Sequence, residues 1–224
     1  MSRPVSNDRF PPFGFNLSWK FYRDDPEDVP ADQVLPNLEI VLAVCRKHDL
    51  LHPTYYLEDD GTPVPFESEE VGKVIDSLRE KVASEELRGE ILRIGGYGLV
   101  CVDEGRTVVQ KDLLTIDSIR LFEHNISVRA PINCWTPLSM DRDYAFHWQV
   151  KLARLNEARL ERCLNDIYQS LGNSVEPDVD EVDAEQPVWM KGFRLYWNPE
   201  ILRREYRKAP PAEPFDLDEY LISK

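Results

Sequence analysis

The sequence predicts an α+β fold: a mostly antiparallel sheet with helices packed on one face, forming a single domain. Residues 15–22, 126–134 and 144–152 alternate apolar and polar side chains, the pattern of strands with one buried face. The elements follow in the order strand, helix, short hairpin, helix, several strands and helix. That order is typical of one α+β domain.

The first third of the chain predicts one strand and two helices. Residues 1–14 hold three prolines and a glycine, so we expect a flexible lead-in before the strand at 15–22. A helix is predicted from about Asp32 to Lys47, with Pro36 in its first turn, where proline is tolerated. Ser68 is the predicted N-cap of a second helix that ends near residues 87–89.

The middle of the chain is predicted to be mainly β. A hairpin is expected over Leu99–Gln110, with its turn at 103–106, and residues 113–122 fit either a strand or a helical turn. Residues 126–152 are interpreted as one long antiparallel hairpin, around which the rest of the sheet is organised. It leads into a helix over residues 157–171 that is capped by Asn156.

The C-terminal part divides at an acidic run. Residues 15–172 are assigned to the α+β domain and 173–187 to an acidic loop or linker, which is too polar to order itself by burial. Residues 188–224 are expected to form a strand and helix extension that packs on the same domain. Within it, Pro199 is predicted to start a short basic helix.

Charge restricts the partners. The 224 residues hold 41 acidic and 27 basic side chains, a net charge of −14. A field of this sign repels phosphate, so we expect neither nucleic acid nor an anionic membrane as a ligand, and we expect a basic protein as a partner. The same excess of acids would also arise from selection for solubility alone.

We expect a cytoplasmic protein. No apolar run approaches the roughly 20 residues that cross a bilayer, and Met1–Phe10 lacks the apolar middle of a signal peptide. The four cysteines are scattered and form no close pair, which favours a reducing compartment and buried thiols. They are Cys45, Cys101, Cys134 and Cys163.

No motif predicts catalysis, a metal or a cofactor. His48 and His52 have the spacing of a zinc-binding pair, but Asp49 replaces the required glutamate and Pro53 disfavours helix at His52. Cys134 and His147, which with Asp143 would make a nucleophilic site, are predicted to lie on opposite faces of the hairpin. The glycines at 95–98 lack the lysine and following helix of a phosphate loop.

Acidic loops remain as the candidate site. We predict partner-binding residues in two acidic stretches and at one nearby tryptophan, because interfaces combine charged steering with aromatic anchors. They are Asp24, Asp25, Glu27, Asp28, Glu176, Asp178, Asp180, Glu181, Asp183, Glu185 and Trp189. The leading hypothesis is a non-catalytic interaction protein, most concretely a bacterial immunity protein that neutralises a basic toxin or nucleic-acid-acting enzyme.

Two alternatives remain open. One is a hydrolase or transferase whose dispersed active site lies on the central hairpin, with His147, Asp143, Glu123 and Arg129 as its residues, because catalytic groups can meet in space without a sequence motif. The other is a structural assembly component. The sequence makes no prediction of oligomeric state.

Overall fold

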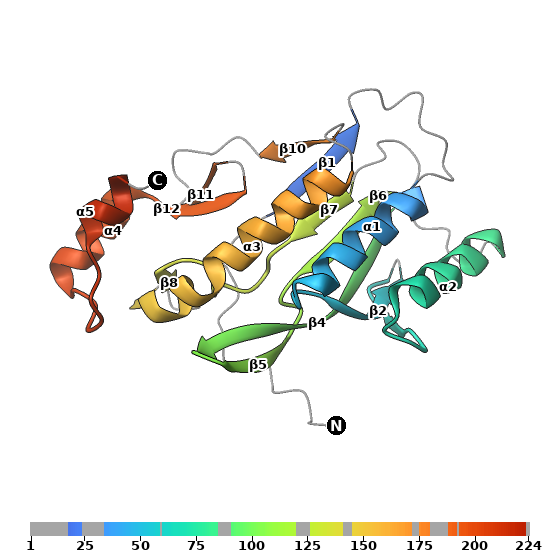
Figure 1. Ribbon diagram of the computed structural model, residues 1–224, viewed down its shortest axis with the longest axis horizontal. Helices are drawn as coiled ribbons and strands as arrows, with labels where there is room; N and C mark the ends of the chain where they lie inside the picture. The colour runs from blue at the N-terminus through green and yellow to red at the C-terminus, as the bar shows by residue number, and fades with distance from the viewer. Residues whose placement is uncertain are drawn as a thin grey trace.

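The centre of the molecule is an antiparallel sheet of eight strands (Figure 1). The computed structural model describes residues 18–23, 34–58, 60–84, 91–119, 126–140, 145–171, 175–179, 188–191 and 193–222. Seven strands follow the order β10–β1–β7–β6–β4–β2–β3, and β5 pairs with the far half of β4. The bounds are β1 Ser18–Arg23, β2 His52–Leu57, β3 Pro63–Pro65, β4 Ile91–Asp103, β5 Arg106–Lys111, β6 Thr115–Ile119, β7 Ile126–Arg129 and β10 Val175–Val179.

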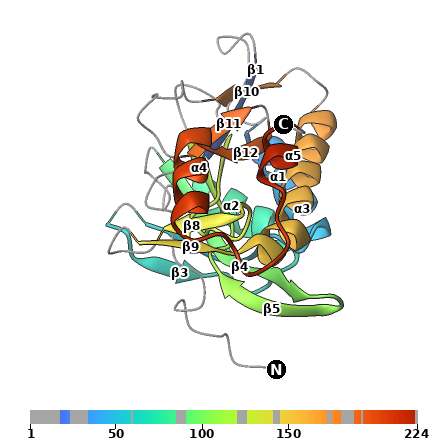
Figure 2. The same ribbon diagram turned by 90° about the vertical axis from the view of Figure 1, so that its left-hand side faces the viewer.

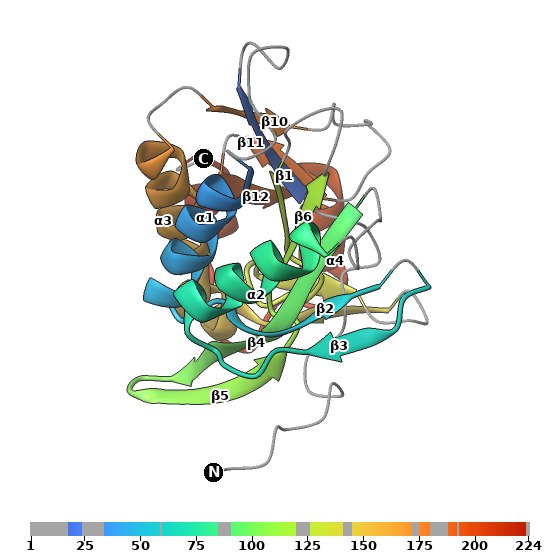
Figure 3. The ribbon, with the colours of Figure 1, turned by 90° about the vertical axis from the view of Figure 1, so that its right-hand side faces the viewer.

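Three helices cover one face of this sheet, as Figures 1 and 3 show, which confirms the predicted α+β class. They are α1 (Val34–Lys47), α2 (Val71–Ala83) and α3 (Val150–Ser170). Helix α1 packs against both α2 and α3, and α3 crosses β4. Pro36 lies in the first turn of α1, as predicted.

A cross-strand row of buried side chains joins the sheet to these helices. Trp19, Val128, Ile116, Ile94 and Tyr56 are register partners across five neighbouring strands. All are 3% exposed or less, in one cluster with the apolar side chains of the helices. The alternation in the first predicted strand therefore identified its buried face correctly.

The C-terminal elements pack at one end of the molecule (Figure 2). They are β11 (Val188–Lys191), β12 (Arg194–Trp197), α4 (Pro199–Lys208) and α5 (Leu217–Ile222), beside a small hairpin of β8 (Leu138–Met140) and β9 (Phe146–Trp148). The Trp197 indole donates to Thr136 Oγ1 at 2.8 Å, and the Trp148 and Phe215 ring centroids lie 5.5 Å apart. Four of their buried side chains belong to the main core cluster: Val188, Leu195, Trp197 and Leu202.

The long central hairpin is a wrong prediction. Strand β7 lies between β1 and β6 in the main sheet, and β9 pairs with β8 in a separate hairpin. Alternation shows that a segment has one buried face, but it does not show which strand pairs with it.

The predicted start of α3 is also wrong, because the helix begins at Val150 and not after Asn156. Val150 and Ala153 are buried on the stripe that continues to Leu160, so this part fits a helix as well as a strand. Asn156 lies within the helix, fully buried, and binds β4 instead of capping α3.

Other differences concern the ends of elements. Residues 175–179, predicted to be unordered, form β10, because pairing with β1 satisfies backbone groups without requiring apolar side chains. Glu70, not Ser68, is the N-cap of α2, which ends at Ala83. The Leu99–Gln110 hairpin is confirmed, and Thr115–Ile119 is a strand. The predicted lead-in at 1–14 lies outside the described residues.

Candidate functional site

Two of the predicted partner-binding carboxylates belong to the last strand of the main sheet. Glu176 and Asp178 lie in β10, at the register positions opposite Tyr22 and Lys20. Pro177 stands between them, opposite Phe21. Proline removes a backbone donor and is confined to sheet edges, so its presence agrees with the terminal position of β10.

The pairing of β1 with β10 brings two distant parts of the sequence together. Arg23, the last residue of β1, is opposite Val175, the first of β10. The chain therefore leaves β1 toward Asp24 at the corner where it enters β10 toward Glu176. Eight of the predicted residues lie outside the described residues: Asp24, Asp25, Glu27, Asp28, Asp180, Glu181, Asp183 and Glu185. Trp189 lies in β11, opposite Tyr196.

A polar row crosses the sheet next to the apolar row. Asp178, Lys20, Ser127, Asp117 and Arg93 are successive register partners from β10 to β4. Neighbouring residues of a strand point to opposite faces, so the described polar side chains of this row lie on the face away from the helices.

A buried carboxylate is the centre of this polar face. The Asp117 side chain is 4% exposed, and Arg93 binds it in a bidentate manner, with Nε and Nη2 at 2.7 and 3.0 Å from its oxygens. Arg129 Nε lies 2.8 Å from Oδ2, without the alignment of a hydrogen bond. The hydrogen bond to Asp117 raises the pKa of Arg93.

This Arg–Asp–Arg cluster is not predicted from the sequence. Each of its members is a charged residue within a β-prone run, which is the signal that could have found it. An isolated buried carboxylate is costly, whereas this one has two cationic partners, each with about a third of its side chain exposed. The cluster therefore links side chains of three neighbouring strands, β4, β6 and β7.

A second polar contact lies beside it, where Tyr55 donates to Asp112 Oδ1 at 2.7 Å. Burial, together with this hydrogen bond, raises the pKa of the Tyr55 hydroxyl well above its ordinary value. A phenol held protonated in this way is a hydrogen-bond donor and not a general base. Lys111 Nζ lies 5.5 Å from the Tyr55 ring centroid.

The two described residues of the dispersed catalytic alternative lie in different sheets. Arg129 is in β7 of the main sheet, whereas His147 is exposed in β9 of the small hairpin. Asp143 and Glu123 lie outside the described residues. Cys134 is fully buried, and burial raises the pKa of its thiol, so it is poorly suited to act as a nucleophile.

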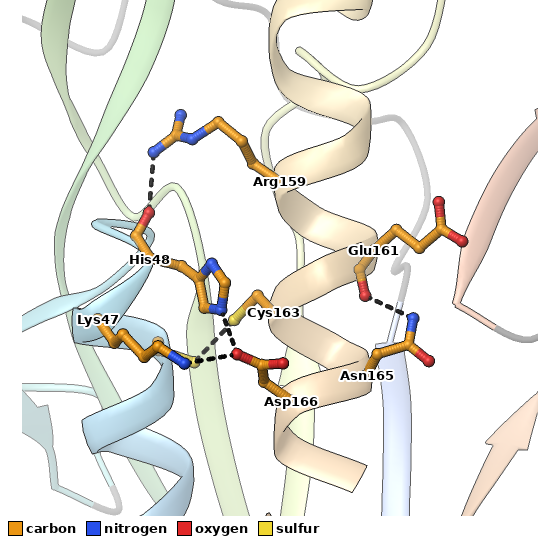
Figure 4. Close-up of polar contacts among 8 residues, drawn as sticks. Lys47, His48, Arg159, Glu161, Cys163, Asn165 and Asp166 are labelled. Carbon is orange, nitrogen blue, oxygen red and sulfur yellow. Dashed lines mark hydrogen bonds and ion pairs between the residues drawn. The ribbon is translucent and has the colours of Figure 1, made fainter. Parts of the chain in front are cut away.

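The two histidines with zinc-like spacing each contact a different carboxylate. His48 Nε2 lies 2.9 Å from Asp166 Oδ2, which also accepts a hydrogen bond from Lys47 (Figure 4). His52 Nε2 lies 3.1 Å from Asp49 Oδ1. The former pair joins α1 to α3. In the part of the chain that the structure describes, no three His, Cys, Asp or Glu side chains gather in a metal-binding group.

A basic surface on α4 departs from the overall charge. Three arginines line an open cavity of about 440 Å³ together with Asn198, Glu200 and Ile201. They are Arg203, Arg204 and Arg207. Arg204 pairs with Glu205 at 2.8 Å, and Arg207 Nε donates to the Arg203 carbonyl. The molecule is therefore not uniformly acidic.

Comparison with known proteins returns no relative: no family model, no curated protein and no solved structure matches this chain. Among the helices that the structure describes, none is long and apolar enough to cross a bilayer.

Proposed function

We propose that the protein is a non-catalytic inhibitor that binds a basic protein, most concretely a bacterial immunity protein that neutralises a toxin domain. One observation supports this proposal more than any other: the pairing of Arg23 with Val175 sets Glu176 beside the end of β1 at which the acidic stretch 24–28 begins. Carboxylates of these two stretches would steer a cationic partner and block its site.

The edge strand itself favours recognition through side chains. Pro177 interrupts the backbone donors of β10, so β10 is poorly suited to pair with a further strand. Glu176 and Asp178 then serve as charged contacts, with Trp189 as the proposed aromatic anchor. All four cysteines are free thiols, which supports a cytoplasmic location.

The test is affinity capture from the native host, quantified by mass spectrometry. We expect the wild type to enrich a basic protein, and the variant Glu176→Gln/Asp178→Asn to recover much less of it. The control, Glu67→Gln/Glu80→Gln, removes the same charge from exposed positions before and within α2 and should recover the partner fully.

Salt provides a second readout for a partner that is captured. An interaction steered by opposite charges weakens as salt rises, and its association rate falls most. Enrichment of no protein, or equal recovery by all three chains, would refute the proposal.

A further inference from the structure

We propose that strand β5 is an interface through which two copies of this chain pair edge to edge, forming one antiparallel sheet across a two-fold axis. This inference is independent of the acidic partner-binding corner. It rests on the direction of the backbone groups of β5, on its exposure and on a comparison with the other sheet edges.

The hydrogen bonds of β4 establish which way the β5 backbone points. Leu99 N–H donates to the Asp49 carbonyl at 2.8 Å, and Arg159 donates to the Leu99 carbonyl at 2.8 Å. The Asn156 amide binds both the N–H and the C=O of Cys101. The backbone groups of Leu99 and Cys101 therefore face away from β5.

Their register partners must face the other way. Leu99 is opposite Val109, and Cys101 is opposite Thr107. In an antiparallel pair that is not hydrogen bonded, both residues direct N–H and C=O away from each other. The N–H and C=O groups of Thr107 and Val109 consequently point outward from the sheet.

Among the described residues, none pairs with this outer edge. In the described ranges, no hydrogen bond reaches the outward groups of Thr107 or Val109, and only the Lys111 carbonyl is occupied, by the Gln110 amide at 2.8 Å. Thr107 is exposed and Val109 is partly exposed. Unpaired edges of this kind are templates for a further strand.

The other edges of the sheet are interrupted by proline and this one is not. Edge β3 begins and ends with proline, at Pro63 and Pro65, and β10 carries Pro177 between two acids. Strand β5 holds no proline, and its two charged residues, Arg106 and Lys111, stand at its ends. Natural sheets use proline and charged side chains to prevent edge pairing, so the uncharged residues 107–109 are the part of β5 where pairing is tolerated.

A second copy of the chain fits this edge, because a two-fold axis brings the same strand of both copies together in antiparallel orientation. Pairing about Val109 places Val109 opposite its own copy and Thr107 opposite Lys111 of the other copy, which uses every outward residue. In this register no two basic side chains lie directly opposite each other, so there is no like-charge repulsion between the paired residues. The interface closes after two copies and does not propagate.

Sedimentation tests the proposal. We expect wild-type protein to form a dimer whose population rises with concentration and with salt, because two copies of charge −14 repel each other and salt screens that repulsion. Thr107→Pro removes an outward donor from each copy and should raise the dissociation constant on the order of tenfold. Thr107→Val keeps the donor and should leave that constant unchanged.

Cross-linking provides a readout if the proline variant fails to fold. Val109→Cys places two thiols at a hydrogen-bonded pair, where the Cα separation of about 5.5 Å permits a disulfide. Mild oxidation should link this variant into dimers, but not Ser84→Cys, which is exposed at the end of α2, nor the wild type. A monomer at every concentration, or a dimer that neither Thr107→Pro weakens nor Val109→Cys cross-links, would overturn the proposal.

Discussion

The side chain of Asn156 binds both backbone polar groups of Cys101. Its Oδ1 accepts from the Cys101 N–H at 3.0 Å, and its Nδ2 donates to the Cys101 carbonyl at 2.8 Å. A neighbouring strand would make the same two bonds, so helix α3 replaces a strand along this part of β4. Arg159 extends the replacement by one residue, through its bond to the Leu99 carbonyl.

Removal of this amide should be costly. Asn156→Ala leaves the N–H and the C=O of the partly buried Cys101 without this partner, and Asn156 itself is fully buried. We expect the free energy of unfolding, measured by urea denaturation, to fall by about 2–4 kcal/mol. Asn165→Ala is the matched control, because Asn165 lies on the same helix, is exposed, and donates to the Glu161 carbonyl (Figure 4). Equal losses in the two variants would show that Asn156 is not required for this pairing.

Two glycines should respond in opposite directions to alanine. A Cβ at Gly96 would overlap the backbone carbonyl of His52 in the adjacent strand, whereas a Cβ at Gly72 meets nothing within 4 Å. Gly96→Ala must therefore shift β2 away from β4, and we expect a loss of about 3 kcal/mol or more. Gly72→Ala lies in helix α2 and should raise stability by about 0.5–1 kcal/mol. Thermal unfolding of both variants tests the prediction, which fails if Gly96→Ala melts at the wild-type temperature.

Side-chain alternation is a local property, which is why it predicted so much of the fold. The alternation alone predicts that Trp19 and Phe21 share one face of their strand, and both side chains are buried. The basic helix from Pro199 was equally predictable, since Asn198 caps it and proline suits its first turn. The α+β class follows from such local evidence.

Which strands pair with each other depends on contacts between distant segments, and the alternation within one segment does not reveal them. Ile126–Arg129 alternates correctly but pairs with β1 and β6, not with the segment that follows it. The Arg93–Asp117–Arg129 cluster could not be predicted for the same reason, because its members meet only after three strands are ordered. The sequence predicts Asn156 as a helix cap because the backbone group that it binds, on Cys101, is 55 residues away along the chain.

The buried Asp117 gives a third prediction. Asp117→Asn leaves two guanidinium groups side by side without their counter-ion, but both can still reach water, since about a third of each side chain is exposed. We therefore expect a loss of about 1–3 kcal/mol in urea denaturation, less than for a fully enclosed pair. Asp76→Asn is the control, because Asp76 and Arg79 form an exposed ion pair that contributes below about 1 kcal/mol. If Asp117→Asn and Asp76→Asn lowered the free energy of unfolding equally, the cluster would contribute no more than an exposed ion pair.

Acid should loosen the contact between α1 and α3. Hydrogen bonds from Lys47 and from His48 lower the pKa of Asp166. The folded state consequently binds fewer protons at Asp166 than the unfolded chain, whose aspartates titrate near pH 4. The stabilisation is complete above about pH 5 and is lost as the pH falls through 4 toward the lowered value.

Urea denaturation at several pH values would measure this effect. Asp166→Asn should unfold with a smaller decrease in free energy between about pH 5 and pH 3 than the wild type. The difference should stay below about 1 kcal/mol, because 39% of the Asp166 side chain is exposed and solvent weakens the pair. Asp218→Asn, at an exposed position of α5, should keep the wild-type slope. If Asp166→Asn also kept that slope, the ion pairs to Lys47 and His48 would not contribute to stability in solution.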